Sequence, residues 1–214
     1  QVAGAAELLR DAEVEADRLG VADVQVAIGF RREAGADSRV LAAGKVVIGG
    51  LFDIASAAGR NRIARLNADG TVDVSFDPGF GADNTVHAVA LQPDGKILIG
   101  GSFGSVNGNA RRGIARLNAN GSIDTSFNVG GGANGAVRDI LLLSNGKIMI
   151  AGDFTMYNGV TQNRVARLNA NGTLDNSFNP GGGPNGIVYA LALQPDGKFF
   201  IAGNFTAVAG VPRV

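Results

Sequence analysis

The chain has 214 residues, with 19 acidic and 19 basic side chains, one histidine, no cysteine and 45% apolar residues. The apolar content indicates a packed core rather than disorder, and the zero net charge disfavours binding to nucleic acid, which needs a basic face. The lack of cysteine excludes a cysteine nucleophile, and we expect no zinc site of the usual kind. No apolar run approaches the ~20 residues of a membrane span, and the first residues do not resemble a signal peptide.

Residues 1–43 differ from the rest of the chain. Apolar residues at helical spacing between Ala5 and Leu19 predict a short amphipathic helix that ends near Gly20. Alternation from Val24 to Phe30 predicts a strand. Three interpretations stay open for this N-terminal segment: the tail of a preceding domain, a non-native lead-in, or a cap on the open end of the part that follows.

From residue 44 to 214 the sequence repeats with a period of 51. Four lysines mark the same place in successive repeats, each opening an apolar segment that ends in Gly-Gly or Ala-Gly, and they are Lys45, Lys96, Lys147 and Lys198. A fixed period without a slip is typical of repeat architectures. We therefore divide the chain into the non-repeat segment 1–43 and about three and a half repeats in 44–214.

The unit that covers residues 86–135 predicts four short strands. Pro93-Asp94-Gly95 and Ala119-Asn120-Gly121 each fit a type I turn followed by a glycine with positive φ. A polar loop and a connector rich in glycine and asparagine separate the remaining elements. The expected strands are 86–91, 96–103, 114–118 and 122–127, with the polar loop at 105–113 and the connector at 128–135.

The three-residue turn also predicts which side chains face each other across the last two strands of each repeat. It sets Arg65 opposite Asp73, and the same count applies one and two repeats later. Opposite charges directly across an antiparallel pair attract, and a half-buried arginine needs such a partner. We expect three structural ion pairs, none of them catalytic: Arg65–Asp73, Arg116–Asp124 and Arg167–Asp175.

A single small sheet cannot bury both faces, so we expect successive sheets to stack. Four strands in about 50 residues are typical of a propeller blade, and the Gly-Gly at the end of the second strand suits crowding near an axis. The predicted fold is all-β: a β-propeller-like array of four-stranded antiparallel blades, with a short N-terminal helix and strand outside the repeat. Phenylalanines are expected to fill the gaps between blades: Phe52, Phe76, Phe103, Phe127, Phe154, Phe178 and Phe205.

Residues 91–103, 112–128 and their copies resemble the delta-60 repeat, a β-propeller-like repeat family. The resemblance covers about 44–214 and leaves 1–43 unexplained. It implies large bacterial secreted or cell-surface proteins with adhesion-type modules, and it implies no agreed activity, so no functional residue is carried over. Propellers typically close with 4–8 blades. We therefore favour a fragment of a longer protein over closure by self-association or an open stack of sheets.

Candidate catalytic and metal-binding residues are few. His87 is replaced by Arg138 and Tyr189 in the next repeats, so we expect no catalytic role for it. Residues 67–73 place oxygen-bearing side chains around a glycine turn, as calcium loops do, but they lack the full acidic spacing and the terminal glutamate. The hairpin interpretation explains them without a metal.

Two glycine clusters, 130–132 and 181–183, have no following Lys-Ser/Thr and are expected to be connectors between blades rather than phosphate-binding loops.

The loops 104–113, 155–163 and 206–213 vary most between repeats, and variable loops on a constant frame are where such scaffolds recognise ligands. The expected function is a non-catalytic extracellular or cell-surface scaffold that binds proteins or glycans through these loops. The alternatives are a structural spacer in a large adhesin or fibre, and a fragment of an enzyme whose site lies in a central channel or in missing blades. We expect no catalytic residue, metal or cofactor, no nucleic acid, and no membrane insertion; further repeats or self-association would close the propeller.

Overall fold

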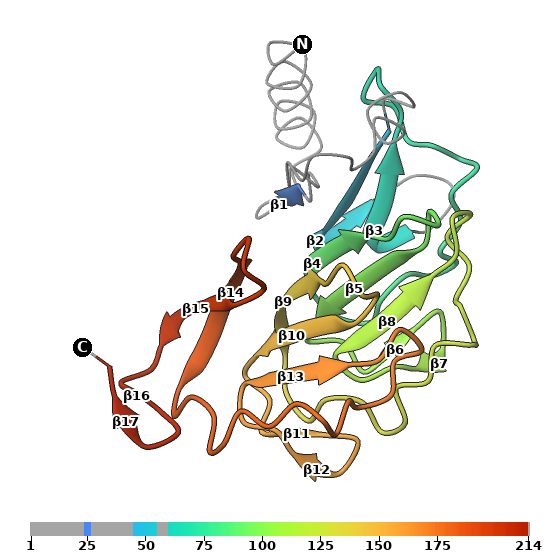
Figure 1. Ribbon diagram of the computed structural model, residues 1–214. Coiled ribbons are helices and arrows are strands. Elements are labelled where there is room, and N and C mark those ends of the chain that lie inside the picture. The colour runs from blue at the N-terminus through green and yellow to red at the C-terminus, as the bar shows by residue number, and fades with distance from the viewer. Residues whose placement is uncertain (1–23, 27–44, 55–59, 214) are drawn as a thin grey trace.

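The computed structural model of the protein describes residues 24–26, 45–54 and 60–213 (Figure 1). This part of the chain contains strands and turns and no helix, which confirms the all-β prediction. The predicted N-terminal helix and most of the predicted strand 24–30 lie outside the described residues. The remaining piece, β1 (Val24–Val26), pairs antiparallel with β2 (Val46–Ile54), so residues ahead of the repeats add a strand to the first sheet.

The strands form four principal sheets that follow the 51-residue period. In each of the first three, the second strand of the repeat is central and pairs antiparallel on both sides; the fourth is a hairpin. The sheets are β1–β2–β3, with β3 at Arg60–Leu66; β4 (Val86–Leu91), β5 (Ile97–Gly101) and β8 (Ile114–Leu117); β9 (Val137–Leu142), β10 (Ile148–Gly152) and β13 (Val165–Leu168); and β14 (Ile187–Leu193) with β15 (Phe199–Asn204).

The fourth strand expected in each blade is reduced to one bridge. Leu117 pairs with Ile123, and the chain then turns, with the Phe127 amide donating to the Asp124 carbonyl. The Asp124 carboxylate accepts from the Ser126 amide, and such local side-chain bonds compete with a strand ladder. Among the described residues, the sheets of the first three blades therefore have three strands and one bridge in place of the expected fourth strand.

The predicted polar loops between the second and third strands contain small hairpins. In the second repeat, β6 pairs with β7 around Asn107 and Gly108, whose φ angles are 45° and 73°. Two successive positive φ angles define a type I′ turn, whose twist suits a tight hairpin. The hairpins are β6 (Ser105–Val106) with β7 (Asn109–Ala110), β11 (Met156–Tyr157) with β12 (Val160–Thr161), and β16 (Ala207–Val208) with β17 (Val211–Pro212).

The three-residue turns are confirmed. At Pro93-Asp94-Gly95 the Gly95 amide donates to the Gln92 carbonyl over 2.9 Å, and the Gln92 amide donates to the Lys96 carbonyl over 2.8 Å. Gly95 has a φ of 82° and Gly121, in the other turn, has a φ of 93°. A side chain is disfavoured in this left-handed region, so glycine holds both turns.

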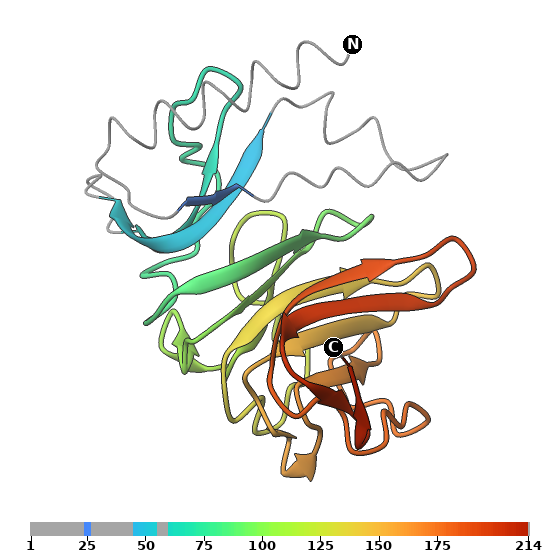
Figure 2. The ribbon, with the colours of Figure 1, turned by 90° about the vertical axis from the view of Figure 1, so that its left-hand side faces the viewer.

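The sheets stack in chain order and spread apart toward their third strands (Figures 1 and 2). Neighbouring sheets contact through their first and second strands, as β4 and β5 do with β9. The closest approaches occur at glycines: a Cβ on Gly49 would lie 2.6 Å from Val86 Cγ1, and one on Gly100 would lie 2.8 Å from Val137 Cγ1. These contacts confirm the predicted crowding at the ends of the second strands.

Apolar clusters cross from one sheet to the next. Phe76, from the first repeat, is fully buried with Val86 and Ile97 of the second. Phe127 is buried in the same way with Val137 and Ile148 of the third. The core is therefore made between blades, as the positions of these phenylalanines predict. Within the described residues, no helix is long and apolar enough to span a bilayer.

Candidate functional site

Each of the first three repeats buries one carboxylate between two cations. Asp124 is 6% exposed, and its Oδ2 lies 2.8 Å from Arg116 Nε and 2.9 Å from Lys96 Nζ. The first and third repeats reproduce this arrangement. The carboxylate–arginine–lysine sets are Asp73–Arg65–Lys45, Asp124–Arg116–Lys96 and Asp175–Arg167–Lys147. The three predicted Arg–Asp pairs are confirmed. A lysine adds a second cation to each pair, and the strict spacing of these lysines was the only sign in the sequence that they have a structural role.

Hydrogen bonds keep these carboxylates ionised. Burial by itself would raise the pKa of Asp124, but hydrogen bonds from Ser126, Lys96 and Arg116 outweigh burial and hold the pKa well below its usual range. The same balance lowers the pKa of Asp73. For Asp175 the bond from Lys147 is the strongest cause of the lowering. A carboxylate that is permanently charged and paired is not suited to proton transfer.

The arginines of the first two networks also tie one repeat to the next. Arg116 donates from Nη1 to the Ala170 carbonyl of the following repeat over 2.7 Å, and its guanidinium lies over the Phe127 ring at 4.7 Å. Arg65 reaches the Ala119 carbonyl in the same manner, also at 2.7 Å. With Nε and Nη2 of Arg116 bound to Asp124 and Ser126, this network is structural.

The segment considered as a calcium loop has its carboxylates bound to protein groups. Asp69 Oδ1 accepts from the Thr71 hydroxyl at 2.6 Å and from the Thr71 amide, while Asp73 is bound by Lys45 and Arg65. Over the described ranges, no group of three or more His, Cys, Asp or Glu side chains is arranged to hold a metal ion.

The glycine clusters 130–132 and 181–183 lie in connectors between sheets, as expected. Each connector continues into an isolated bridge with the hairpin of the following repeat, between Ala133 and Tyr157 of the third repeat and between Pro184 and Val208 of the fourth. The second repeat has the corresponding bridge between Ala82 and Val106. The connectors therefore serve as the platform on which the hairpins rest.

We call the three hairpins β6–β7, β11–β12 and β16–β17 the hairpin surface. Their tips are fixed: Asn158 Oδ1 accepts from the Gly131 amide at 2.9 Å, and Asn107 Oδ1 accepts from the Phe80 amide at 3.2 Å. The inner residue of β11, Tyr157, is fully buried, and its hydroxyl donates to the Gly172 carbonyl at 2.7 Å. Hydrogen bonds with the connectors thus hold the tips of the hairpins, by side chains in β6–β7 and β11–β12 and by the Ala209 amide bonded to the Gly183 carbonyl in β16–β17.

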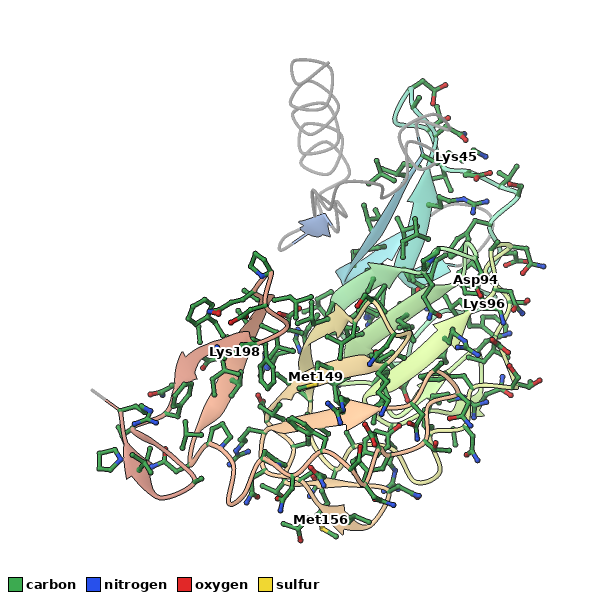
Figure 3. The ribbon with its side chains drawn as sticks, in the orientation of Figure 1. Lys45, Asp94, Lys96, Met149, Met156 and Lys198 are labelled. Carbon is green, nitrogen blue, oxygen red and sulfur yellow. The ribbon has the colours of Figure 1, made fainter. Side chains whose placement is uncertain are left out.

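The outer residues of the hairpin surface differ from repeat to repeat. Met156 and Val160 project from β11–β12 with exposed fractions of 39% and 47%, and Val211 of β17 is half exposed. Figure 3 shows Met156 on this hairpin, away from the stacked sheets. At the positions of Met156 and Val160 the second repeat has Ser105 and Asn109. This surface contains the loops that sequence variation singled out.

His87 lies at the start of β4, and its Nε2 is 2.8 Å from the Ser102 hydroxyl oxygen. Burial, with the nearby Arg138 charge, lowers the pKa of the imidazole. A hydrolytic Ser–His pair requires a third group that orients the base. No carboxylate in the described part of the chain is hydrogen-bonded to His87 Nδ1.

A fan of small antiparallel sheets with buried inter-blade seams, at a period of 51 residues, defines a β-propeller repeat protein. The chain belongs to the family described as domain of unknown function (DUF5122) beta-propeller, which matches residues 43–76, 92–127, 143–178 and 194–214. The second, third and fourth matches begin 51 residues apart, and the second spans Lys96, Arg116 and Asp124. The matched segments therefore cover the residues of the structural network. No curated protein matches the chain.

Proposed function

We propose that this propeller-repeat chain is a non-catalytic binding scaffold whose ligand-facing part is the hairpin surface. The observation that carries the proposal is the contrast within each repeat. The hairpin tips are fixed to the connectors in the same way, whereas the outer residues change from Ser105 and Asn109 to Met156 and Val160. A constant frame with varied, exposed projections is the arrangement that repeat scaffolds use for recognition.

A protein ligand fits this surface. Met156, Val160 and Val211 expose apolar side chains among polar neighbours, and exposed apolar patches with a polar rim are typical of protein-binding sites. Methionine adapts its shape to a partner. The likeness of residues 91–103 and 112–128 to delta-60 repeats supports placing this module in an extracellular or bacterial cell-surface protein.

The test compares capture of surface and extracellular proteins by the wild-type chain, by the double variant Met156→Ser/Val160→Ser, and by Phe200→Ser. Phe200 is exposed on β15, outside the hairpin surface, and serves as the matched apolar control. The proposal expects a protein that binds the wild type and the control but binds the double variant at least tenfold more weakly in a titration with the purified partner. Undiminished binding to the double variant would contradict it.

A structural spacer in a large adhesin or fibre is the second candidate. It is favoured by the inter-repeat bonds from Arg65 and Arg116, which stiffen the stack. A spacer would capture no protein through any of the three chains, so the same experiment separates the two functions.

A further inference from the structure

A row of polar side chains crosses three sheets at one β-bulge. The pairing of first and second strands is interrupted between Val86 and Ala88, and at the corresponding places in the next two sheets. A bulge leaves one extra residue and re-aims its side chain. The extra residues are His87, Arg138 and Tyr189, and the ends of the second strands add Ser102, Asp153 and Asn204; we call these six the bulge row.

The backbone of the bulge row repeats, but its chemistry does not. His87 contacts Ser102, as described above. One repeat later, Arg138 Nε and Nη2 donate to Asp153 Oδ1 and Oδ2 at 3.0 and 2.7 Å, a two-pronged ion pair. In the fourth sheet Tyr189 is half exposed, and Asn204 is exposed beside it on the partner strand. Most core residues of the second and third sheets stay apolar, and these two sheets keep their network residues, so the row stands out within them by its change of chemistry.

The members of the row are near one another. β4 packs against β9, and β9 packs against β14. The Arg138 charge affects the imidazole of His87 on one side, and Tyr189 interacts electrostatically with Arg138 on the other. Packed sheets lie about 10 Å apart, so the three positions span about 20 Å. A ligand that contacts all three must be extended.

The charges of the row disfavour an anion, and the described residues include no group of three or more side chains that could hold a metal ion. Asp153 neutralises Arg138, and Asp139 adds a second carboxylate that accepts from the Leu191 amide of the next sheet at 2.6 Å. What remains is an ion pair whose two side chains are about 30% exposed. The exposed side of the Arg138–Asp153 pair offers hydrogen-bond donors and acceptors next to each other, and the exposed ring of Tyr189 lies nearby on the next sheet. A sugar hydroxyl both donates and accepts, and a ring with a polar tip packs against a partly apolar ligand.

We propose that the bulge row binds a neutral oligosaccharide laid across the second, third and fourth sheets. The Arg138–Asp153 pair holds adjacent hydroxyls, Tyr189 packs against the face of a sugar ring, and the His87–Ser102 pair bonds the far end. This site is separate from the hairpin surface and does not depend on a protein ligand there.

The experiment titrates the whole chain with the neutral cello-, manno- and N-acetylchito-oligosaccharides and follows the heat of binding. We expect one of these series to bind, and Tyr189→Ala and Asp153→Asn each to weaken that binding about tenfold, since each removes one ligand contact. Lys198→Ala is the matched control: Lys198 is an exposed residue near the turn of the same β14–β15 hairpin, paired only with Asp196, and its loss leaves binding unchanged.

Thermal unfolding of each variant checks that the fold is intact. Asp153→Asn keeps the shape of the side chain, and Tyr189 lies on the surface, so both variants are expected to unfold near the wild-type temperature. Absence of binding to all three series would overturn the proposal, and so would affinities that stay at the wild-type value in both variants.

Discussion

The buried carboxylates Asp73, Asp124 and Asp175 show how the number of residues in a turn determines which side chains pair across two strands. The turn length of Ala119-Asn120-Gly121 suffices to place Arg116 across from Asp124, so this pair can be predicted from sequence. The contact between Lys96 and Asp124 cannot be predicted in this way. Asp124 comes just after the single bridge at Ile123, where the sequence predicts a full strand instead. The periodic lysines were visible, but their partner was not.

Removing that carboxylate is expected to be costly. Asp124→Ala leaves Arg116, itself buried, without its charge partner, and breaking a buried pair in this way costs about 3–5 kcal/mol of unfolding free energy. Denaturant unfolding measures the loss. Asp153→Ala, which breaks the partly exposed pair with Arg138, is the control and is expected to cost about 1 kcal/mol or less. A loss of about 1 kcal/mol or less for Asp124→Ala would show that the Asp124 network does not stabilise the fold.

At the scale of elements, the sequence predicts the first three strands of a blade well and the rest poorly. Apolar alternation and glycine turns mark β4, β5 and β8, whereas residues 122–127 continue the pattern without forming a ladder because Asp124 and Ser126 bond locally. The small hairpins were missed although Asn107-Gly108 and Asn158-Gly159 are strong signals for type I′ turns. In a segment of polar residues between long strands, two-residue strands carry too little alternation to be recognised.

The hairpin β11–β12 is expected to depend on one buried hydroxyl. Tyr157→Phe removes the bond to the Gly172 carbonyl and leaves that acceptor without its partner, which costs about 1 kcal/mol. Hydrogen exchange should show faster exchange of the amides that close this hairpin, such as Gln162 bonded to the Thr155 carbonyl. The hairpin β6–β7, which has Val106 at the same place, is an internal control. Unchanged exchange in β11–β12 would show that packing alone holds it.

For the molecule as a whole, stability lies in the seams between sheets, and the 51-residue period was enough to predict this. Leu98 of β5 is fully buried in a cluster with Val137 and Ile140 of the following sheet. Met149 occupies the same place in β10, and Figure 3 shows it facing the β14–β15 hairpin. The residues at the outer hairpin positions, such as Met156 and Val160, could not be derived in this way, because a repeat pattern records what recurs and those side chains differ.

Seam positions are expected to matter only where a sheet follows. Leu98→Ala should lower the unfolding free energy by about 2–5 kcal/mol, since it opens a cavity between two sheets. Phe200→Ala changes the corresponding residue of the fourth repeat, which is 62% exposed, and is expected to stay within about 0.5 kcal/mol of the wild type. Chemical denaturation of both variants measures the difference. A large loss for Phe200→Ala would mean that this face is already covered.

The bonds from Arg65 and Arg116 to the following repeat make each of these two blades depend on the blade made after it. Each guanidinium is completed by a carbonyl 54 residues further along, so a blade obtains its last donor–acceptor contact only after its successor has been translated. Because folding during synthesis proceeds from the N-terminus, we expect Arg65 and Arg116 to gain these contacts only once the second and third blades, respectively, have been made.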